Sequence, residues 1–285
     1  MLGTVQVDPG IYPGVKFDEY SEWAGINFSS LRHFGKTPAH AHYEAGHQKD
    51  TASKDFGHMV HTVVLEPESL SAEYIVAPKV DRRTKKGKAA WAAFEARAEG
   101  RIIVKEDDFQ KARSIVLNIR DHMTIRELLA AKGHNELSMV WEDPEFGVLC
   151  KGRIDRLCEF NGVGWIVDIK THGHPASTHS FQKAVADYGY HEQMSFYRRG
   201  LEVLRPLPDG APPRKSAWLV AESQPPNCVR LFESEDAALE MGADKVAEHL
   251  STYSRCMETG VWPAWDQGME VAGLPAWAYK RFGVD

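Results

Sequence analysis

Between residues 136 and 171, three of the carboxylates and one of the lysines have a spacing that could support chemistry. Asp155 is followed, after twelve residues, by Asp168 and Lys170, and Glu136 stands nineteen positions ahead of Asp155. Carboxylate oxygens are the ligands that Mg²⁺ prefers, and the ion keeps several waters when they bind it. A lysine beside such an ion can stabilise the negative charge that grows on an attacked phosphate. These residue types therefore predict metal-assisted cleavage of a phosphodiester.

A tight turn would bring the two aspartates together. Asn161 and Gly162 lie between two apolar segments, and both residues tolerate the positive φ of a two-residue hairpin turn. Asp155 and Asp168 are then expected on adjacent strands. Because side chains along a strand alternate between its two faces, Asp168 and Lys170 share one face.

The triplet of an acid, any residue and a lysine is by itself common on solvated strand faces. Here its neighbours are the apolar residues Trp165, Ile166, Val167 and Ile169. They indicate a mostly buried strand, in which unpaired charges are rarely tolerated. A site is therefore favoured over a solvated face.

The rest of the chain predicts helices around this strand region. Asn27, Ser29 or Ser30 can cap the first helix, and Thr37-Pro38 begins the second. The order of elements predicts an α/β fold with a central mixed sheet flanked by helices. The expected helices are 27–31, 37–47, 56–65, 89–99, 108–132, 180–204 with an interruption near Gly189, and 236–260, and the expected late strands are 216–222 and 228–232.

Composition bounds the class of protein. A chain of 285 residues with 43% hydrophobic and 26% charged residues can bury a sizeable core. We expect one domain over residues 1–285, because there is no internal repeat and no Ser/Gly-rich linker, with residues 1–15 as a poorly ordered N-terminal tail. No segment approaches the ~18–20 apolar residues of a membrane span, and a signal peptide is absent. A cytoplasmic location without membrane contact is expected.

Cysteines and paired histidines give weaker signals. The four cysteines are widely spaced, so we expect buried free thiols and neither a zinc site nor an iron–sulfur cluster. His40 and His42, like His172 and His174, imitate metal-binding pairs. No accompanying zinc motif supports them, so we expect both pairs on the surface or in loops.

Four segments in this order carry a family resemblance: Gly57–His61, Lys151–Asp155, Val167–Thr171 and Gln193–Tyr197. The chain resembles the PD-(D/E)XK nuclease superfamily, and within it the phage-type recombination exonucleases related to RecE (exonuclease VIII) and, more distantly, lambda exonuclease. Ile154 stands where the superfamily's name has proline. The resemblance implies a restriction-endonuclease-like core.

The resemblance implies a metal site and a catalytic lysine. His61, Asp155, Asp168 and the backbone carbonyl of Ile169 would bind Mg²⁺, and a histidine among the ligands also suits Mn²⁺. Lys170 would orient or deprotonate the attacking water and stabilise charge on the phosphate.

Three further residues are implied to assist. Glu136 matches an acidic position ahead of the hairpin that could hold a second ion or the water. Gln193 and Tyr197 lie one turn apart on one helix face and would support Lys170 or the DNA end.

DNA binding requires positive charge on a chain whose net charge is −6. One basic cluster precedes Trp91, and it is either a solvated loop or a DNA contact; we favour the contact. Weaker candidates could grip a terminal phosphate. No base-reading motif is present, so binding through the backbone is expected to be independent of sequence. The basic cluster consists of Arg82, Arg83, Lys85, Lys86 and Lys88, and the weaker candidates are Arg153, Ser30 and Arg32.

The expected function is a Mg²⁺-dependent exonuclease that degrades linear double-stranded DNA from its ends. The resemblance alone implies 5′→3′ polarity, release of mononucleotides and a ring-shaped homo-oligomer, a trimer or tetramer. It also implies a phage or prophage origin and work beside a single-strand annealing protein in homologous recombination. Two alternatives remain: a structure-specific or RecB-like endonuclease on the same core, and a non-catalytic DNA-binding module.

Overall fold

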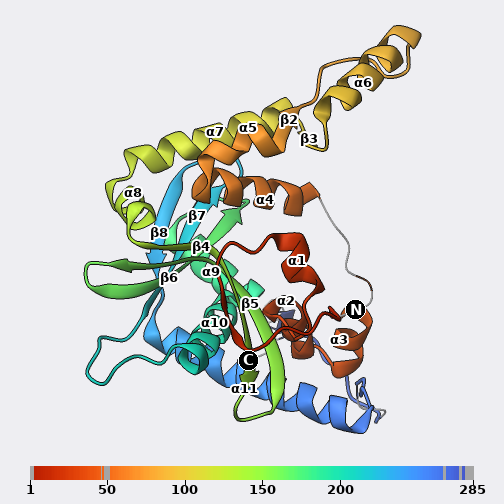
Figure 1. Ribbon diagram of the computed structural model, residues 1–285. Helices are drawn as coiled ribbons and strands as arrows, with labels where there is room; N and C mark the ends of the chain where they lie inside the picture. Colours follow the sequence, from red (N-terminus) through yellow and green to blue (C-terminus); the bar gives the residue numbers. More distant parts are fainter. Residues whose placement is uncertain (1–2, 46, 48–51, 266–267, 276–277, 280–285) are drawn as a thin grey trace.

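A six-stranded mixed sheet forms the centre of the computed structural model, which describes residues 3–45, 47, 52–265, 268–275 and 278–279 (Figure 1). Neighbouring strands are antiparallel except β6 and β7, which are parallel. The prediction of a mixed sheet flanked by helices is confirmed. The strands, in spatial order, are β1 (Gly10–Tyr12), β4 (Gly133–Asp143), β5 (Val148–Phe160), β6 (Val163–His172), β7 (Lys215–Glu222) and β8 (Val229–Glu233).

The predicted hairpin joins β5 to β6. Asn161 and Gly162 have φ values of 53° and 75°, the left-handed conformation that such a turn requires. Beyond the turn, the two strands pair in register from Phe160 opposite Val163 to Arg156 opposite Val167. The hairpin therefore carries Asp155 and Asp168 on neighbouring strands.

Three helices cover one face of the sheet. The crossover from β6 to β7 consists of α9 (Thr178–Tyr188) and α10 (Tyr190–Leu204), and α11 (Asp236–Thr259) packs against α10. Gly189, with φ of 67°, separates α9 from α10, so the predicted interruption is confirmed. The buried core on this side includes Phe196, Leu201, Trp218 and Leu250.

A second layer covers the other face (Figure 1). It consists of α4 (Ala52–Leu65), α7 (Glu106–Asp121) and α8 (Met123–Ala130). The prediction of one continuous helix over residues 108–132 is wrong, because His122 is extended at φ −94° and ψ 101°. Its Nδ1 accepts a hydrogen bond from the Ile125 N–H and so begins a new helix.

The prediction of a poorly ordered tail is wrong for the strand at Gly10–Tyr12. β1 pairs with β4, from Gly10 opposite Val140 to Tyr12 opposite Ser138. The Tyr12 ring contacts Trp23, just after α1 (Phe17–Glu22), with ring centroids 5.2 Å apart. A partner more than 120 positions away leaves no local signal in the sequence.

Two short elements follow α1 and lead into α3 (Pro38–Ala45). They are α2 (Phe28–Leu31) and the 3-10 helix η1 (Arg32–Gly35). Asn27 caps α2 as predicted, because its Oδ1 accepts a hydrogen bond of 2.9 Å from the Ser30 N–H.

An arm carries the basic cluster away from the sheet. After the 3-10 helix η2 (Pro67–Ser69) and α5 (Leu70–Glu73), β2 (Tyr74–Val76) pairs in parallel with β3 (Ile102–Val104). Between these strands, α6 (Lys85–Ala98) projects from the body of the molecule (Figure 1). Thr84 caps α6 through the Gly87 N–H at 2.9 Å.

Three of the four cysteines are buried free thiols, as expected, but Cys228 is exposed. Among the described residues, no helix has the length and apolarity to cross a membrane.

Candidate active site

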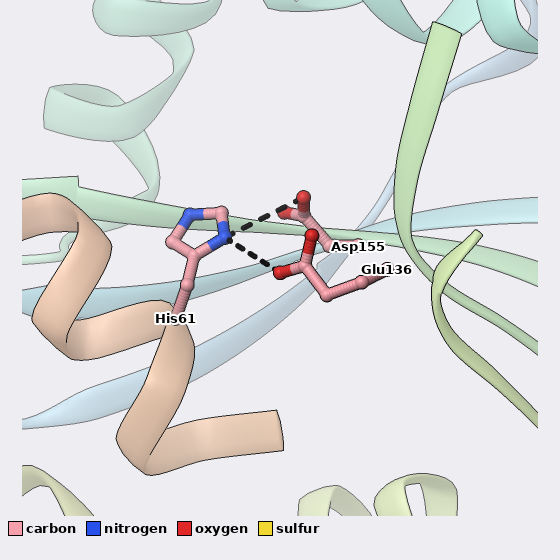
Figure 2. A group of neighbouring side chains, drawn as sticks. All are labelled: His61, Glu136 and Asp155. Carbon is pink, nitrogen blue, oxygen red and sulfur yellow. Dashed lines mark ion pairs between the residues drawn. The ribbon is translucent and has the colours of Figure 1, made fainter. Parts of the chain in front are cut away.

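His61 connects α4 to β6 through a hydrogen bond. Its Nε2 lies 3.1 Å from the backbone oxygen of Ile169 and donates a hydrogen bond to it. In the neutral ring, this bond leaves the lone pair of Nδ1 free on the opposite side. Nδ1 points toward two carboxylates, 3.5 Å from Asp155 Oδ1 and 3.8 Å from Glu136 Oε1 (Figure 2). Burial lowers the pKa of His61, but these carboxylates and Asp168 outweigh it and raise the pKa to about 9.

Glu136 reaches this group from the first half of β4 in a strained conformation. Its φ is 50°, the left-handed region that a glutamate rarely adopts inside a strand. One carboxylate oxygen faces His61, and the other accepts a hydrogen bond of 2.6 Å from Arg153 Nε. Burial raises the pKa of Glu136, but His61 and Arg153 reverse this and hold it below its usual value. The strained residue is thus the one that brings a second carboxylate to His61.

Asp155 is held by both strands of the hairpin. It lies on β5, and its Oδ2 accepts a hydrogen bond of 2.6 Å from the Ile169 N–H on β6. Burial, with Asp168 and Glu136 nearby, raises its pKa to about 7 against the opposing charges of His61 and Lys170. Close carboxylates repel one another, so a cation among them would stabilise the ionised forms.

His61, Glu136 and Asp155 form a group that could hold a metal ion, and this group is called the metal group below. One donor atom from each lies within 4.8 Å of the other two. One nitrogen and several carboxylate oxygens suit Mg²⁺ and Mn²⁺. Asp168 on the neighbouring strand adds a further buried carboxylate, whose Oδ2 is paired with Lys170 Nζ. The residues therefore fit a divalent cation.

Two predicted ligands lie beside the metal group. Asp168 Oδ2 forms an ion pair of 2.6 Å with Lys170 Nζ. This contact places Asp168 and Lys170 on one face, as the strand alternation predicts. The Ile169 carbonyl accepts the hydrogen bond from His61. The structure thus brings His61, Asp155 and Glu136 together, with Asp168 and Ile169 on the adjoining strand.

Lys170 is fixed by side chains of α10. Its Nζ donates a hydrogen bond of 2.8 Å to Gln193 Oε1, and Gln193 Nε2 donates one of 3.0 Å to the Tyr197 hydroxyl. Burial lowers the pKa of Lys170, but Asp168 and Asp155 raise it above its usual value. The neighbouring carboxylates favour the ammonium form of Lys170, which suits it to stabilise negative charge.

Sequence reasoning missed two contacts of the site. The Tyr190 ring lies under Lys170 Nζ, 4.6 Å from ring centroid to nitrogen. The sequence signal for Tyr190 was its position three residues ahead of Gln193, which places both on one face of the helix. The pairing of Arg153 with Glu136 had no such signal, because the two residues belong to different strands.

Gly152 makes room for the Tyr197 ring beside β5. A Cβ at this position would lie 2.9 Å from the terminal methyl of Met139 and 3.2 Å from the Tyr197 ring. The glycine of the Lys151–Asp155 segment therefore permits the close packing of α10 that holds Gln193 under Lys170.

The predicted DNA-binding residues occupy three different places. The basic cluster is exposed on the α6 arm, where the Arg82 guanidinium stacks over Trp91 at 4.1 Å. Arg32 is exposed, whereas Ser30 is buried in α2. Arg153 is engaged, since its Nη1 donates to the Val15 carbonyl at 2.7 Å while its Nε holds Glu136.

The histidine pairs differ from each other. His40 and His42 are exposed on α3, as expected, and so is His174. His172 is buried at the end of β6, which corrects the expectation of a surface position. Its Nε2 lies 2.9 Å from Ser180 Oγ, so a side-chain partner on α9 satisfies the buried ring.

Comparisons with known proteins show the family and the fold of the chain. A family model described as a PDDEXK-like domain of unknown function (DUF3799) matches residues 27–271. The chain is similar to the crystal structure of a "putative exonuclease" from Eubacterium rectale, with a TM-score of 0.56 and 15% identity over 90% of this chain and 92% of that one. A second structure, of SSO0001, has a TM-score of 0.26 and 17% identity over 67% of this chain and 85% of that one. No curated protein matches. The resemblance to the PD-(D/E)XK superfamily is confirmed.

Proposed function

The chain belongs to the family of PDDEXK-like domains of unknown function (DUF3799), and from this premise we propose that it is a metal-dependent deoxyribonuclease that degrades linear duplex DNA from its ends. One observation carries the proposal: the metal group of His61, Glu136 and Asp155 lies beside the Lys170–Asp168 ion pair on the neighbouring strand. Fold alone does not specify an activity, whereas this set of side chains is suited to hydrolysis of a phosphodiester.

The metal group would hold Mg²⁺, and Mn²⁺ as a substitute. When bound, the ion lowers the pKa of a water and neutralises a phosphoryl oxygen. The resemblance adds Asp168 as a further ligand. It also implies the Ile169 carbonyl, which in this structure accepts the hydrogen bond from His61 Nε2 instead, on the side of the ring opposite Nδ1. Ile169 also contributes its N–H to Asp155 and its carbonyl to His61, so one residue of β6 orients two of the ligands.

Lys170 would stabilise the charge that develops on the attacked phosphate. Its ammonium is preorganised, because Asp168, Gln193 and the Tyr190 ring hold it from three sides. Tyr197 in turn orients the Gln193 amide through its hydroxyl group. These residues would keep the cation in place without rearrangement during the reaction.

The substrate would be gripped through its phosphates. The basic cluster on the α6 arm supplies exposed charge, and stacking of Arg82 on Trp91 leaves the edge of the guanidinium able to donate. Arg32 is proposed to bind a terminal phosphate, whereas Ser30 is buried in α2 and does not reach one. The proposed binding depends on the backbone and not on the base sequence.

Finer features of the function rest on the resemblance alone. They are 5′→3′ polarity, release of mononucleotides, a ring-shaped trimer or tetramer, and cooperation with a single-strand annealing protein. A phage or prophage origin, action in the cytoplasm of a bacterial host and a role in recombination belong to the same proposal.

A cleavage assay on labelled DNA tests the proposal. Purified protein is incubated with end-labelled linear duplex, carrying either a 5′-phosphate or a 5′-hydroxyl, in Mg²⁺ or EDTA. We expect Mg²⁺-dependent loss of mononucleotides from linear DNA and none from a covalently closed circle. Cleavage of the circle would instead indicate an endonuclease on the same core. Absence of any cleavage under all metal conditions would contradict the proposal.

A further inference from the structure

We propose that Phe17 forms a base-stacking platform, on which a nucleobase of the DNA rests beside the phosphodiester held at the metal group. This inference builds on the proposed nuclease function. Phe17 lies ahead of residues 27–271, which match the family model. The proposed platform therefore belongs to a segment that the family match does not cover.

Phe17 exposes an aromatic ring at the start of α1. It is the first residue of the helix and is 53% exposed. Its ring contacts Tyr20, at 6.3 Å between centroids, and meets the His58 ring edge-on at 5.6 Å. An exposed aromatic ring supported on its other sides offers a surface on which a flat apolar group can stack.

The ring lies close to the metal group. His58 is on α4, three residues ahead of His61, and residues at this spacing share one face of a helix with ~5–6 Å between their Cβ atoms. Phe17 is thus separated from a proposed metal ligand by one intervening side chain. Figure 1 shows α1 beside α4.

Two cations of β5 hold the Phe17 segment against the site. Lys151 Nζ donates to the carbonyls of Tyr20, Ser21 and Trp23 at 2.6–3.2 Å, which ties down the end of α1. Arg153 donates to the Val15 carbonyl, two residues before Phe17, and with the same guanidinium holds Glu136 of the metal group. The position of the Phe17 ring is therefore coupled to that of a proposed ligand.

The chemistry of the ring selects a nucleobase as its occupant. A phosphodiester bound at the metal group carries its own bases, so a base must lie next to the site. Stacking on an aromatic ring accepts any base, because every base has a π-face. Phenylalanine has no polar group with which to read a base edge. This agrees with binding that does not depend on sequence.

The test compares Phe17→Ala and Phe17→Trp with the wild type on two kinds of DNA. One set of duplexes is intact, and the other has a single abasic residue at each of the first three positions of the cleaved strand. The control is Met241→Ala, which shortens a side chain that is 66% exposed on α11, on the other face of the sheet. Thermal unfolding verifies that each variant is folded.

We expect Phe17→Ala to lose roughly 5- to 150-fold in kcat/KM on intact DNA, the range for loss of one stacked base. The wild type should lose a similar factor at one abasic position, and Phe17→Ala should lose nothing more there. Phe17→Trp and Met241→Ala should match the wild type. The platform would be overturned if the loss from Phe17→Ala and the loss from the abasic residue multiply when they are combined. It would also be overturned if Phe17→Ala equals the wild type on both substrates.

A binding measurement separates this inference from the nuclease proposal. On rapid mixing in Mg²⁺, 2-aminopurine at the corresponding position reports stacking through its fluorescence before cleavage. We expect the wild type to change this fluorescence and Phe17→Ala to bind the duplex without changing it. An unchanged signal in the wild type would overturn the platform even if the enzyme cleaves. A signal that depends on Phe17 in a protein without cleavage would support the platform and contradict only the nuclease activity.

Discussion

His61 and the backbone carbonyl of Ile169 form a hydrogen bond of 3.1 Å, although the two residues are 108 positions apart in the chain. The bond fixes α4 against β6 and leaves the other ring nitrogen pointing at Asp155 and Glu136 (Figure 2). Since the Ile169 N–H holds Asp155 as well, one peptide segment sets the orientation of a nitrogen donor and an oxygen donor.

Mg²⁺ should stabilise the wild type but not Asp155→Asn. In EDTA the variant should unfold at the wild-type temperature or above it, because it loses one of several neighbouring negative charges while its amide oxygen can still accept the Ile169 N–H. At a hundredfold excess over Kd, a bound ion adds about 2.7 kcal/mol. Calorimetry with and without Mg²⁺ measures the difference, and equal gains in both proteins would contradict a site at Asp155.

Lys170→Ala should lower kcat by at least roughly 100-fold, the effect typical of losing one preorganised charge donor. DNA binding in EDTA should change little, because Lys170 is mostly buried beside Asp168. Single-turnover cleavage separates the two quantities. Lys215→Ala removes an exposed lysine paired with Glu233 and should retain wild-type activity. Full activity of Lys170→Ala would exclude the assigned role.

Gln193→Ala should reduce kcat by a smaller factor, of about ten, because Asp168 and Tyr190 still hold the ammonium of Lys170. Gln193→Glu should keep Lys170 paired, since a carboxylate also accepts its hydrogen bond. Steady-state kinetics on linear duplex would rank the kcat values of Gln193→Glu, Gln193→Ala and Lys170→Ala. A Gln193→Ala loss as large as that of Lys170→Ala would show that Gln193 contributes directly.

Neutralising Lys85, Lys86 and Lys88 should weaken DNA binding and flatten its dependence on salt. Each phosphate contact contributes about 0.9 to the slope of log K against log salt, so the slope should decrease by up to about 2.7. Fluorescence anisotropy over a range of salt concentrations measures it. A control triple variant at exposed positions away from the arm should leave the slope unchanged; it comprises Lys132, Lys215 and Lys245. An unchanged slope in both triple variants would show that the lysines of α6 are solvated and do not contact DNA.

Arg199→Met should destabilise the fold more at pH 7 than in acid. Burial raises the pKa of Asp143, but Arg199 and the N–H groups of Glu145 and Phe146 lower it below its usual value. A carboxyl whose folded pKa is lowered contributes stability above its unfolded pKa of about 3.9, and loses it as pH falls through the folded pKa. At pH 7 the cost should be about 3 kcal/mol, since Asp143 is fully buried and would lose its partner.

Urea unfolding at pH 7 and pH 3 checks this dependence, and the gap between Arg199→Met and the wild type should narrow at pH 3. Lys215→Met breaks an exposed pair and should cost at most about 1 kcal/mol. A gap that stays constant with pH would show that Arg199 stabilises through its packing on Phe146 instead.

Lys151→Met should loosen α1 without unfolding the sheet. The ammonium satisfies three carbonyls, and their loss of a buried donor should cost about 1–3 kcal/mol. Hydrogen exchange should rise in residues 17–23 and stay unchanged in β6. Uniform exchange across the chain would mean that Lys151 supports the whole fold.

The sequence by itself determined the hairpin and the residue types of the site. Asn161 and Gly162 specify a local turn, and strand alternation places Asp168 and Lys170 on one face, because both depend only on near neighbours along the chain. The motif order was also sufficient for the superfamily.

Only the tertiary structure decided which groups meet. Glu136 approaches His61 and accepts a hydrogen bond from Arg153, and β1 pairs with β4. Each of these contacts joins segments that are far apart in sequence. Periodicity records which face a side chain occupies but not which distant element covers that face. The break at His122 shows the same limit locally, since its side chain caps a new helix within a stretch whose apolar pattern predicted a continuous one.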